Sequence, residues 1–155
     1  MSKCIMGVDP GVSGAVAFYF VSHPYGVSVD DVPIAGGQID PVALTALIKK
    51  YTPSVAMVES VHSMPKQGVA SSFNFGMAFG CVRGVIGALQ VPLHLVTPGK
   101  WKKHFCLTSD KEQSRELAIR LFPGSAFQFN RKKHHGRAEA ALLARYGAET
   151  IGGAA

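Results

Sequence analysis

Apolar runs near the N-terminus alternate with polar turns in the pattern of short strands. Residues 4–8 are mostly apolar and lead to Asp9, a glycine-containing turn follows, and residues 15–21 form a second apolar run. Glycine permits a tight reversal of the chain, so we expect the two runs to pair as an antiparallel hairpin. Residues 26–34 are expected to form a third strand.

Further along the chain, apolar positions recur at helical spacing between shorter apolar runs. Asp40 and Pro41 suit a helix cap and a first-turn position, which predicts a helix through Tyr51. The remaining pattern predicts, in order, a strand at 54–59, a helix at 69–90, a buried strand at 91–96, a short helix after Thr97 that carries Trp101, a helix from Ser109 or Asp110 through Leu121, a loop at 124–130 and a helix after Gly136.

Strands that come first, followed by alternating helices and strands, indicate an α/β fold with a mixed sheet. The chain has 155 residues, of which 47% are hydrophobic, and this is enough for one sizeable core. The pattern contains no linker and no repeat. We therefore expect a single domain over residues 1–150 and a disordered tail at 151–155.

Three acidic residues lie at the ends of apolar segments or inside one. Asp9 and Glu59 each end a predicted strand, and Glu139 lies in the first turns of the last helix. A buried carboxylate needs a compensating partner, so these acids are candidate ligands for a hard divalent cation. His135 precedes Glu139 by four positions and lies roughly 40° from it around the helix, whereas His134 points about 140° away. The alternative for Asp9 is a residue that caps the turn.

A series of short motifs runs in one order from Met6 to Gly147. They are Gly7-Val8-Asp9-Pro10-Gly11, Val58-Glu59, Gln67-Gly68-Val69, Phe73-Asn74-Phe75-Gly76, Val96-Thr97-Pro98, Trp101-Lys102-Lys103, Asp110-Lys111-Glu112-Gln113-Ser114-Arg115, Leu121-Phe122-Pro123 and Arg131-Lys132-Lys133-His134-His135-Gly136-Arg137-Ala138-Glu139-Ala140. In this order they resemble the RuvC-type Holliday-junction resolvases, and most closely the phage and chloroplast branch of that nuclease family.

The resemblance implies an RNase H-like fold, with a mixed five-stranded sheet flanked by helices. It implies a homodimeric endonuclease that resolves four-way DNA junctions by paired, metal-dependent phosphodiester hydrolysis. It also implies two Mg²⁺ ions, for which Mn²⁺ substitutes. Their ligands, which are also the expected catalytic residues, are Asp9, Glu59, Glu139 and a fourth residue. Relatives often carry an acid at the fourth place, where this chain has His135, with His134 as the alternative.

Two cations about 3.5–4 Å apart can generate hydroxide and stabilise the charge of an in-line transition state. Mg²⁺ prefers oxygen ligands in octahedral geometry, so a few carboxylates and the scissile phosphate suffice. A neutral His135 would be a softer ligand that better tolerates Mn²⁺, whereas a protonated one would act as a general acid or pair with phosphate. The alternative is that neither histidine binds metal, and that both lie on a solvated basic loop and contact phosphate only.

The charge of the chain agrees with a nucleic-acid partner. The formal net charge is +6 and the isoelectric point is near 9.4, with most of the sixteen Lys and Arg residues in the C-terminal half. Such clusters attract the phosphate backbone and make binding salt-dependent, and the alternative is a solvated charged face. The candidates for DNA contact are Lys66, Gln67, Ser72, Phe73, Lys102, Lys103, Arg131, Lys132, Lys133 and Arg137.

Individual candidates carry further expectations. Lys102 and Lys103 are expected to face outward from the helix of Trp101. Phe73 is a candidate wedge at the branch point by resemblance. Phe75 and Phe79 fit better as the core side of the following helix.

The helix predicted at 69–90 carries glycines at nearly four-residue spacing. Gly76, Gly80, Gly84 and Gly87 weaken a helix, so their repetition suggests close backbone approach by the sheet or by the same helix of a second subunit. Arg83 interrupts the apolar run and no secretory signal precedes it, so we expect no membrane span.

Other classes of function fit parts of the sequence. A glycine turn after a strand-end acid also occurs in actin-like kinases and ATPases, but these need two such lobes and 155 residues provide one. A non-catalytic branched-DNA-binding protein and another RNase H-like nuclease are the remaining alternatives. Cys4, Cys81 and Cys106 lack zinc-site spacing and are expected to be reduced thiols. The expected location is the cytoplasm, including a host cytoplasm for a phage-encoded protein, with an organelle as the alternative, and no small-molecule substrate is expected.

Overall fold

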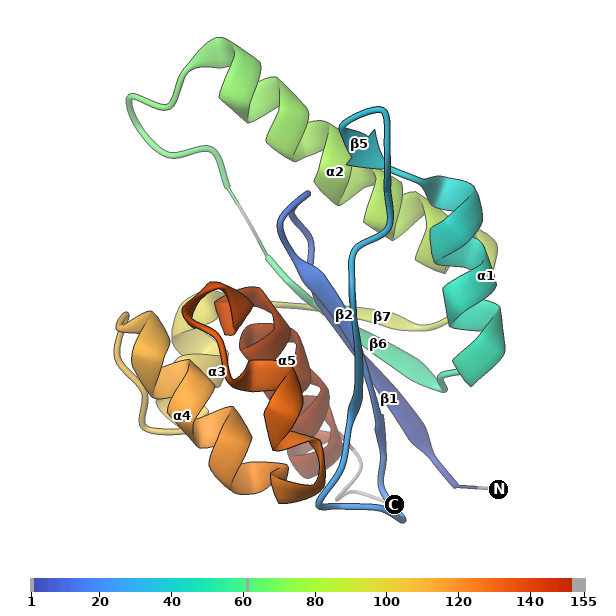
Figure 1. The fold of residues 1–155 in the computed structure, drawn as a ribbon. Helices are drawn as coiled ribbons and strands as arrows, with labels where there is room; N and C mark the ends of the chain where they lie inside the picture. Colours follow the sequence, from blue (N-terminus) through green and yellow to red (C-terminus); the bar gives the residue numbers. More distant parts are fainter. Residues whose placement is uncertain (1, 61, 152–155) are drawn as a thin grey trace.

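The fold is built around a five-stranded mixed sheet (Figure 1). The computed structural model describes residues 2–60 and 62–151, so residues 152–155 of the predicted tail lie outside the described residues. The strand order is β3-β2-β1-β6-β7, with β1 to β3 antiparallel and β1, β6 and β7 parallel. The strands are β1 (Cys4–Asp9), β2 (Ala15–Phe20), β3 (Ser28–Asp31), β6 (Val55–Glu59) and β7 (Leu93–Val96), and a separate ribbon is formed by β4 (Ile34–Ala35) and β5 (Gln38–Ile39).

Helices cover both faces of the sheet, as Figure 1 shows. One face carries α1 (Pro41–Tyr51) and α2 (Val69–Ala88), and the other carries α3 (Pro98–His104), α4 (Lys111–Leu121) and α5 (His135–Thr150), with the short 3-10 helices η1 (Pro123–Phe129) and η2 (Lys132–His134) between α4 and α5. Alternate side chains of a strand enter opposite cores, so Ile5 packs with the α5 side and Met6 with the α1 and α2 side. The predicted α/β fold with a mixed five-stranded sheet is confirmed.

Helix α5 lies unusually close to the central strand because Gly7 has no side chain. A Cβ at this position would collide with the carbonyl oxygen of Ala140 and the backbone nitrogen of Ala144. Every residue from Ala138 to Ala144 is buried. The small side chains of Ala140 and Ala144, opposite Gly7, let the helix axis approach the sheet, and this approach brings the first turns of α5 to the end of β1.

Capping residues and prolines set most element boundaries. The Asp40 carboxylate accepts hydrogen bonds from the amides of Val42 and Ala43, and Asp110 caps α4 in the same way, as their sequence positions predicted. The predicted strand at 26–34 is wrong in its length, because the strand ends before Pro33, which lacks a ladder donor, and the chain then enters the β4–β5 ribbon.

Two further predictions are wrong. The strand β7 was expected to be buried, but it is the edge of the sheet and its His94 and Leu95 are exposed. The loop expected at 124–130 is the 3-10 helix η1, which starts at Pro123 and buries Phe129 in the core.

Helix α2 presents two different faces. Ala78, Val82 and Ile86 are buried against the sheet, whereas a Cβ built on any of its four glycines meets nothing within 4 Å. The sheet therefore does not supply the close neighbour that the glycine spacing suggested, and the alternative of a second subunit stays open. By length and composition alone α2 is able to cross a membrane, with a mean hydropathy of 1.3 over its most apolar window.

Candidate metal centre

Asp9 and Glu59 lie side by side because each stands at the carboxyl end of one of two neighbouring parallel strands. Asp9 is the last residue of β1 and Glu59 is the last of β6, and the two strands pair in register with Val8 opposite Val58. Glu139 reaches the same point from the fifth residue of α5. One oxygen of each carboxylate lies within 4.8 Å of the others. We call these three residues the acidic cluster.

The start of α5 lies directly against Asp9. A Cβ at Gly136, the second residue of the helix, would lie 3.1 Å from Asp9 Oδ2 and 3.2 Å from the carbonyl oxygen of Ser13. The absence of a side chain at Gly136 is what leaves room for the carboxylate. The positive end of the helix dipole also favours a negative charge at this point.

The charge of the acidic cluster is only partly compensated by the protein. Burial, and after it the charges of Glu139 and Glu59, raise the pKa of Asp9 to about 7, against the opposing effect of Lys111 and Lys102. Burial also raises the pKa of Glu59 and of Glu139. Three carboxylates, one buried and two half-buried, that disfavour one another's ionised form are the all-oxygen ligand set that a hard divalent cation stabilises. The residues present therefore fit such an ion.

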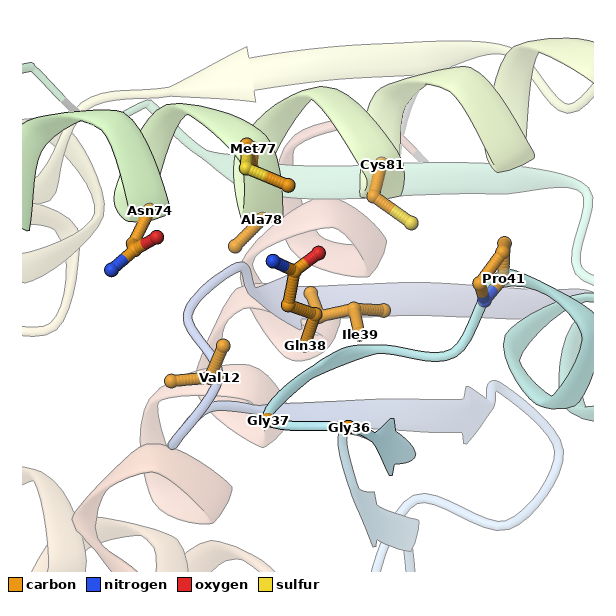
Figure 2. Close-up of a pocket in the computed structure, with 10 residues that line it drawn as sticks. All are labelled: Val12, Gly36, Gly37, Gln38, Ile39, Pro41, Asn74, Met77, Ala78 and Cys81. Atoms are coloured by element: carbon orange, nitrogen blue, oxygen red, sulfur yellow. The ribbon is translucent and has the colours of Figure 1, made fainter. Parts of the chain in front are cut away.

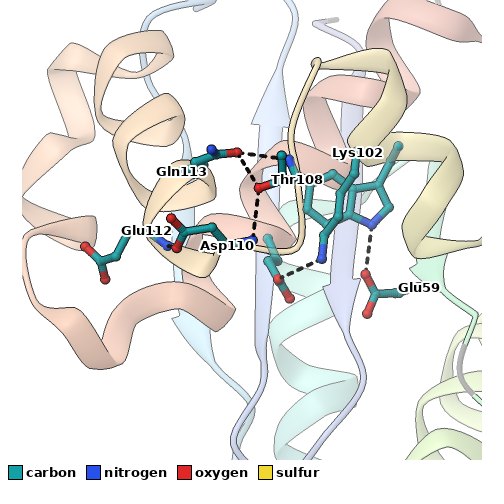
Figure 3. Close-up of polar contacts among 8 residues, drawn as sticks. Glu59, Lys102, Thr108, Asp110, Glu112 and Gln113 are labelled. Carbon is teal, nitrogen blue, oxygen red and sulfur yellow. Dashed lines mark hydrogen bonds and ion pairs between the residues drawn. The ribbon is translucent and has the colours of Figure 1, made fainter.

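Helix α3 supplies two partners for the acidic cluster (Figure 3). The indole Nε1 of Trp101 donates a hydrogen bond of 2.8 Å to Glu59 Oε2, and Lys102 Nζ lies 3.9 Å from Glu139 Oε1. The prediction that Lys102 faces outward is wrong, because its side chain is mostly buried and its ammonium group is drawn to Glu139. Lys103 is exposed as predicted.

Sequence reasoning missed Trp101 and Lys111 as neighbours of the acidic cluster. Lys111 is the first residue of α4, and its charge lowers the pKa of both Asp9 and Glu139. The turn before it is held by hydrogen bonds from the Thr108 amide and hydroxyl to Gln113 Oε1 and from the Asp110 amide to the Thr108 hydroxyl (Figure 3). The signal in the sequence was the cap at Asp110, which fixes where α4 begins.

The acidic cluster includes neither of the two histidines. His134 is buried rather than solvated, and its Nδ1 accepts a hydrogen bond from the Arg131 amide. His135 is half-buried and lines an open depression together with Lys111 and Lys132 at the start of α4. Burial, aided by nearby positive charges, lowers the pKa of each imidazole and so favours its neutral form. The role of His135 as a fourth ligand stays a prediction.

Several candidate DNA-contact residues gather near the acidic cluster. Arg131, Lys132 and Lys133 are exposed around η2, just before α5. Arg137 is engaged within the protein, because its guanidinium forms two hydrogen bonds, of 2.8 and 2.9 Å, with the carboxylate of Asp31. Its predicted phosphate contact would compete with this pair.

The other candidates lie in or after the loop that follows β6. Lys66 is exposed with a φ of 70°, and Gln67 bonds to Ser71 and to the Met64 amide. Ser72 is half-buried, and the ring of Phe73 is 66% exposed. Phe73 is thus free to meet a partner, and DNA contact at these positions stays a prediction.

A groove of about 480 Å³ runs between α2 and the β4–β5 ribbon (Figure 2). The amides of Gln38 and Asn74 face it from opposite sides, and Val12, three residues after Asp9, lies at one end. No charged side chain is among the residues that line it. The groove therefore differs from the acidic cluster, because the residues that line it carry no charge.

Comparison with known structures gives matches over nearly the whole of this chain. RuvC of T. thermophilus, in complex with a Holliday junction substrate, matches with a TM-score of 0.64 over 95% of both chains at 14% identity. The chain shares the fold of RuvC. The fowlpox virus Holliday junction resolvase matches at 0.58 over 96% of this chain and 99% of that one, with 13% identity.

A third match is the yeast mitochondrial Holliday junction resolvase Ydc2. It gives a TM-score of 0.55 over 92% of this chain and 78% of that one, at 16% identity. The sequence itself matches no protein-family model and no curated protein. The RuvC-type fold predicted from the order of the motifs is confirmed by the structural matches.

Proposed function

We propose that this protein is a metal-dependent endonuclease that resolves four-way DNA junctions. The observation that carries the proposal is the convergence of Asp9, Glu59 and Glu139 within 4.8 Å at the sheet edge of a RuvC-type fold. Cations bound at such a place can promote hydrolysis of a phosphodiester, because they stabilise the negative charge of the transition state. The alternatives are a branched-DNA-binding protein without catalysis and another RNase H-like nuclease.

The proposed cofactor is Mg²⁺, in two ions, with Mn²⁺ able to substitute. Asp9, Glu59 and Glu139 would hold them, and His135 is the candidate fourth ligand because it directly precedes Gly136, where an added Cβ would meet Asp9 Oδ2. When bound, such ions supply an activated water and stabilise the charge of the scissile phosphate. Lys102 and Lys111 add positive charge beside the acidic cluster, where it would help to attract and orient that phosphate.

The proposed path of the DNA crosses the basic side of the acidic cluster. Arg131, Lys132 and Lys133 are exposed there and free to contact phosphates. Phe73, exposed at the start of α2, is suited to stack on a base where the strands exchange. Together these groups would bring the backbone of a branched DNA to the carboxylates.

We propose a homodimer formed through the glycine face of α2. Gly76, Gly80 and Gly84 are spaced four residues apart, opposite the buried Ala78 and Val82. Exposed glycines at this spacing let the same helix of a second copy approach closely. A dimer also fits a four-way junction, which presents two equivalent strands for cleavage.

Cleavage of a synthetic four-way junction tests the proposed activity. We expect the wild-type protein with Mg²⁺ or Mn²⁺ to make paired, symmetric nicks. Asp9→Asn and Glu59→Gln should abolish cleavage while keeping or strengthening junction binding, because they remove ligands and also repulsion of phosphate. Glu116→Gln, on the exposed side of α4, is the matched control and should cut normally.

The binding measurement separates the alternatives. Retention of the junction without cleavage under either metal would support the non-catalytic binder. Cleavage that survives in Asp9→Asn would remove Asp9 from the site. Cleavage of linear duplex or RNA–DNA hybrids at the rate of junctions would favour another RNase H-like nuclease.

A further inference from the structure

The register of β6 and β7 determines what lies beside Glu59. Val96, the last residue of β7, pairs with Glu59, and the Ser60 amide donates a 2.8 Å hydrogen bond to the Val96 carbonyl. Helix α3 begins two residues later at Pro98, so its first turn places Trp101 next to the Glu59 side chain. The contact between Trp101 and Glu59 thus follows from strand pairing and a short turn, not from a flexible loop.

Trp101 is fixed more firmly than the carboxylate that it contacts. Its side chain is fully buried in the core between the sheet and α5, whereas Glu59 lies partly open at the sheet edge. Indole Nε1 is a donor only, and Glu59 Oε2 is its acceptor at 2.8 Å. If Glu59 turned away, a buried N–H group would be left without a hydrogen-bond partner, which is unfavourable.

We propose that Trp101 is a positioning residue that holds the Glu59 carboxylate in the orientation needed to bind a divalent cation. One N–H bond uses only part of the acceptor capacity of the carboxylate, so Oε1 and the second lone pair of Oε2 remain available to an ion. The inference rests on the metal site proposed above. It adds that the affinity of the site depends on a buried indole that contacts neither the ion nor DNA.

The charges around Glu59 make this role more important. Glu139 and Glu59 both lie close enough to Asp9 to repel it, and this repulsion favours rotation of the carboxylates away from one another. The hydrogen bond from Trp101 opposes such a rotation for Glu59. Lys102 faces Glu139 from the next position on α3, so α3 contacts two of the three acids (Figure 3).

Calorimetric titration of the full chain with Mn²⁺ alone tests the inference. Trp101→Phe keeps an aromatic ring in the core and removes the N–H donor. We expect it to weaken Mn²⁺ binding by about 10-fold or more, the usual effect of losing an outer-shell partner of a ligand. Tyr19→Phe is the matched control, because Tyr19 belongs to the same core as Trp101 and its substitution should leave the Mn²⁺ affinity unchanged.

Unfolding in urea, measured on the same variants without metal, separates positioning from packing. A purely structural role would lower the free energy of unfolding of Trp101→Phe and leave its Mn²⁺ affinity at the wild-type value, and that result would overturn the inference. If the wild-type protein itself binds no Mn²⁺, that result contradicts the proposed metal site, on which the role of Trp101 rests.

Fluorescence of the unaltered protein gives a test that does not depend on the variant folding. Trp101 is the single tryptophan of the chain. Mn²⁺ bound by Glu59 would lie next to the indole and, being paramagnetic, should quench its emission with the midpoint found by calorimetry. Binding of Mn²⁺ that leaves the emission unchanged would show that the ion is not held beside Trp101.

Discussion

Asp9 occupies a position that is unfavourable for its own charge. It is half-buried at the end of β1, and its loss of solvent together with two neighbouring carboxylates raises its pKa to about 7, from an ordinary value of 3.8. Between these two pH values the folded protein holds a proton that the unfolded chain has released. Stability from this group is therefore present at low pH and is lost as the pH rises toward 7.

In the metal-free protein the contribution of Asp9 to stability should accordingly fall as the pH rises from 3.8 to about 7. Asp9→Asn removes the titrating group, so at pH 8 we expect the variant to be more stable than the wild type, by up to an amount on the order of 4 kcal/mol. Urea unfolding in EDTA at several pH values measures this. The difference between the two proteins cancels the opposite contribution of His134 and His135, whose lowered pKa values disfavour the folded state in acid. Parallel curves for the two proteins would contradict the prediction.

Individual residues of the site differed in how well the sequence revealed them. Asp9 and Glu59 were predictable because each ends an apolar run. The carboxyl ends of neighbouring parallel strands lie side by side, so the two acids meet there. Trp101 was not, since its neighbour Glu59 lies 42 residues away and the contact depends on the pairing of β6 with β7. His135 was placed by helix periodicity, which fixes a direction around α5 but not which neighbour the side chain meets.

At the scale of elements, α2 departs most from what a water-exposed helix should be. It spans 20 residues and buries only one narrow stripe, while its opposite face combines glycines with apolar side chains such as Met77. Helices and their caps could be predicted from spacing, as α1 and α4 show. The exposure of α2 and β7 could not, because it depends on which strand ends at the edge of the sheet and on what covers it.

Gly80→Arg tests the glycine face of α2 by opposite effects on monomer and dimer. In a monomer the substitution would stabilise an exposed helix by up to about 1 kcal/mol, since arginine is a better helix former than glycine. In a dimer it would place two bulky charges between closely packed helices. Light scattering should therefore give twice 16.5 kDa for the wild type and 16.5 kDa for Gly80→Arg.

Val42→Arg, at an exposed position of α1, is the matched control for the added charge. It should leave the mass of the wild-type assembly unchanged. A wild-type mass of 16.5 kDa, or a dimer that persists in Gly80→Arg, would remove α2 as the dimer interface.

At the scale of the whole molecule, the acidic cluster and a group of basic residues lie close to each other. The chain carries a net charge of +6, yet its three clustered acids lie beside the basic segment that leads into α5. The basic residues attract the phosphate backbone to this surface, whereas the acidic cluster repels it. A cation bound by the acidic cluster would remove this repulsion and link the carboxylates to a phosphate. Binding and cleavage should therefore respond differently to salt and to metal.

Lys132 and Lys133 allow the basic part of this surface to be tested through the salt dependence of DNA binding. If both contact phosphates, replacing them together with alanine should weaken junction binding and reduce the slope of log K against log salt by about 2, close to 0.9 per lost contact. The matched control replaces Lys49 and Lys50, an adjacent pair in the last turn of α1 on the opposite side of the sheet, and should leave the slope unchanged. Equal slopes for all three proteins would mean that DNA does not reach η2, because counterion release depends on where the phosphates are neutralised and not on the total charge of the chain.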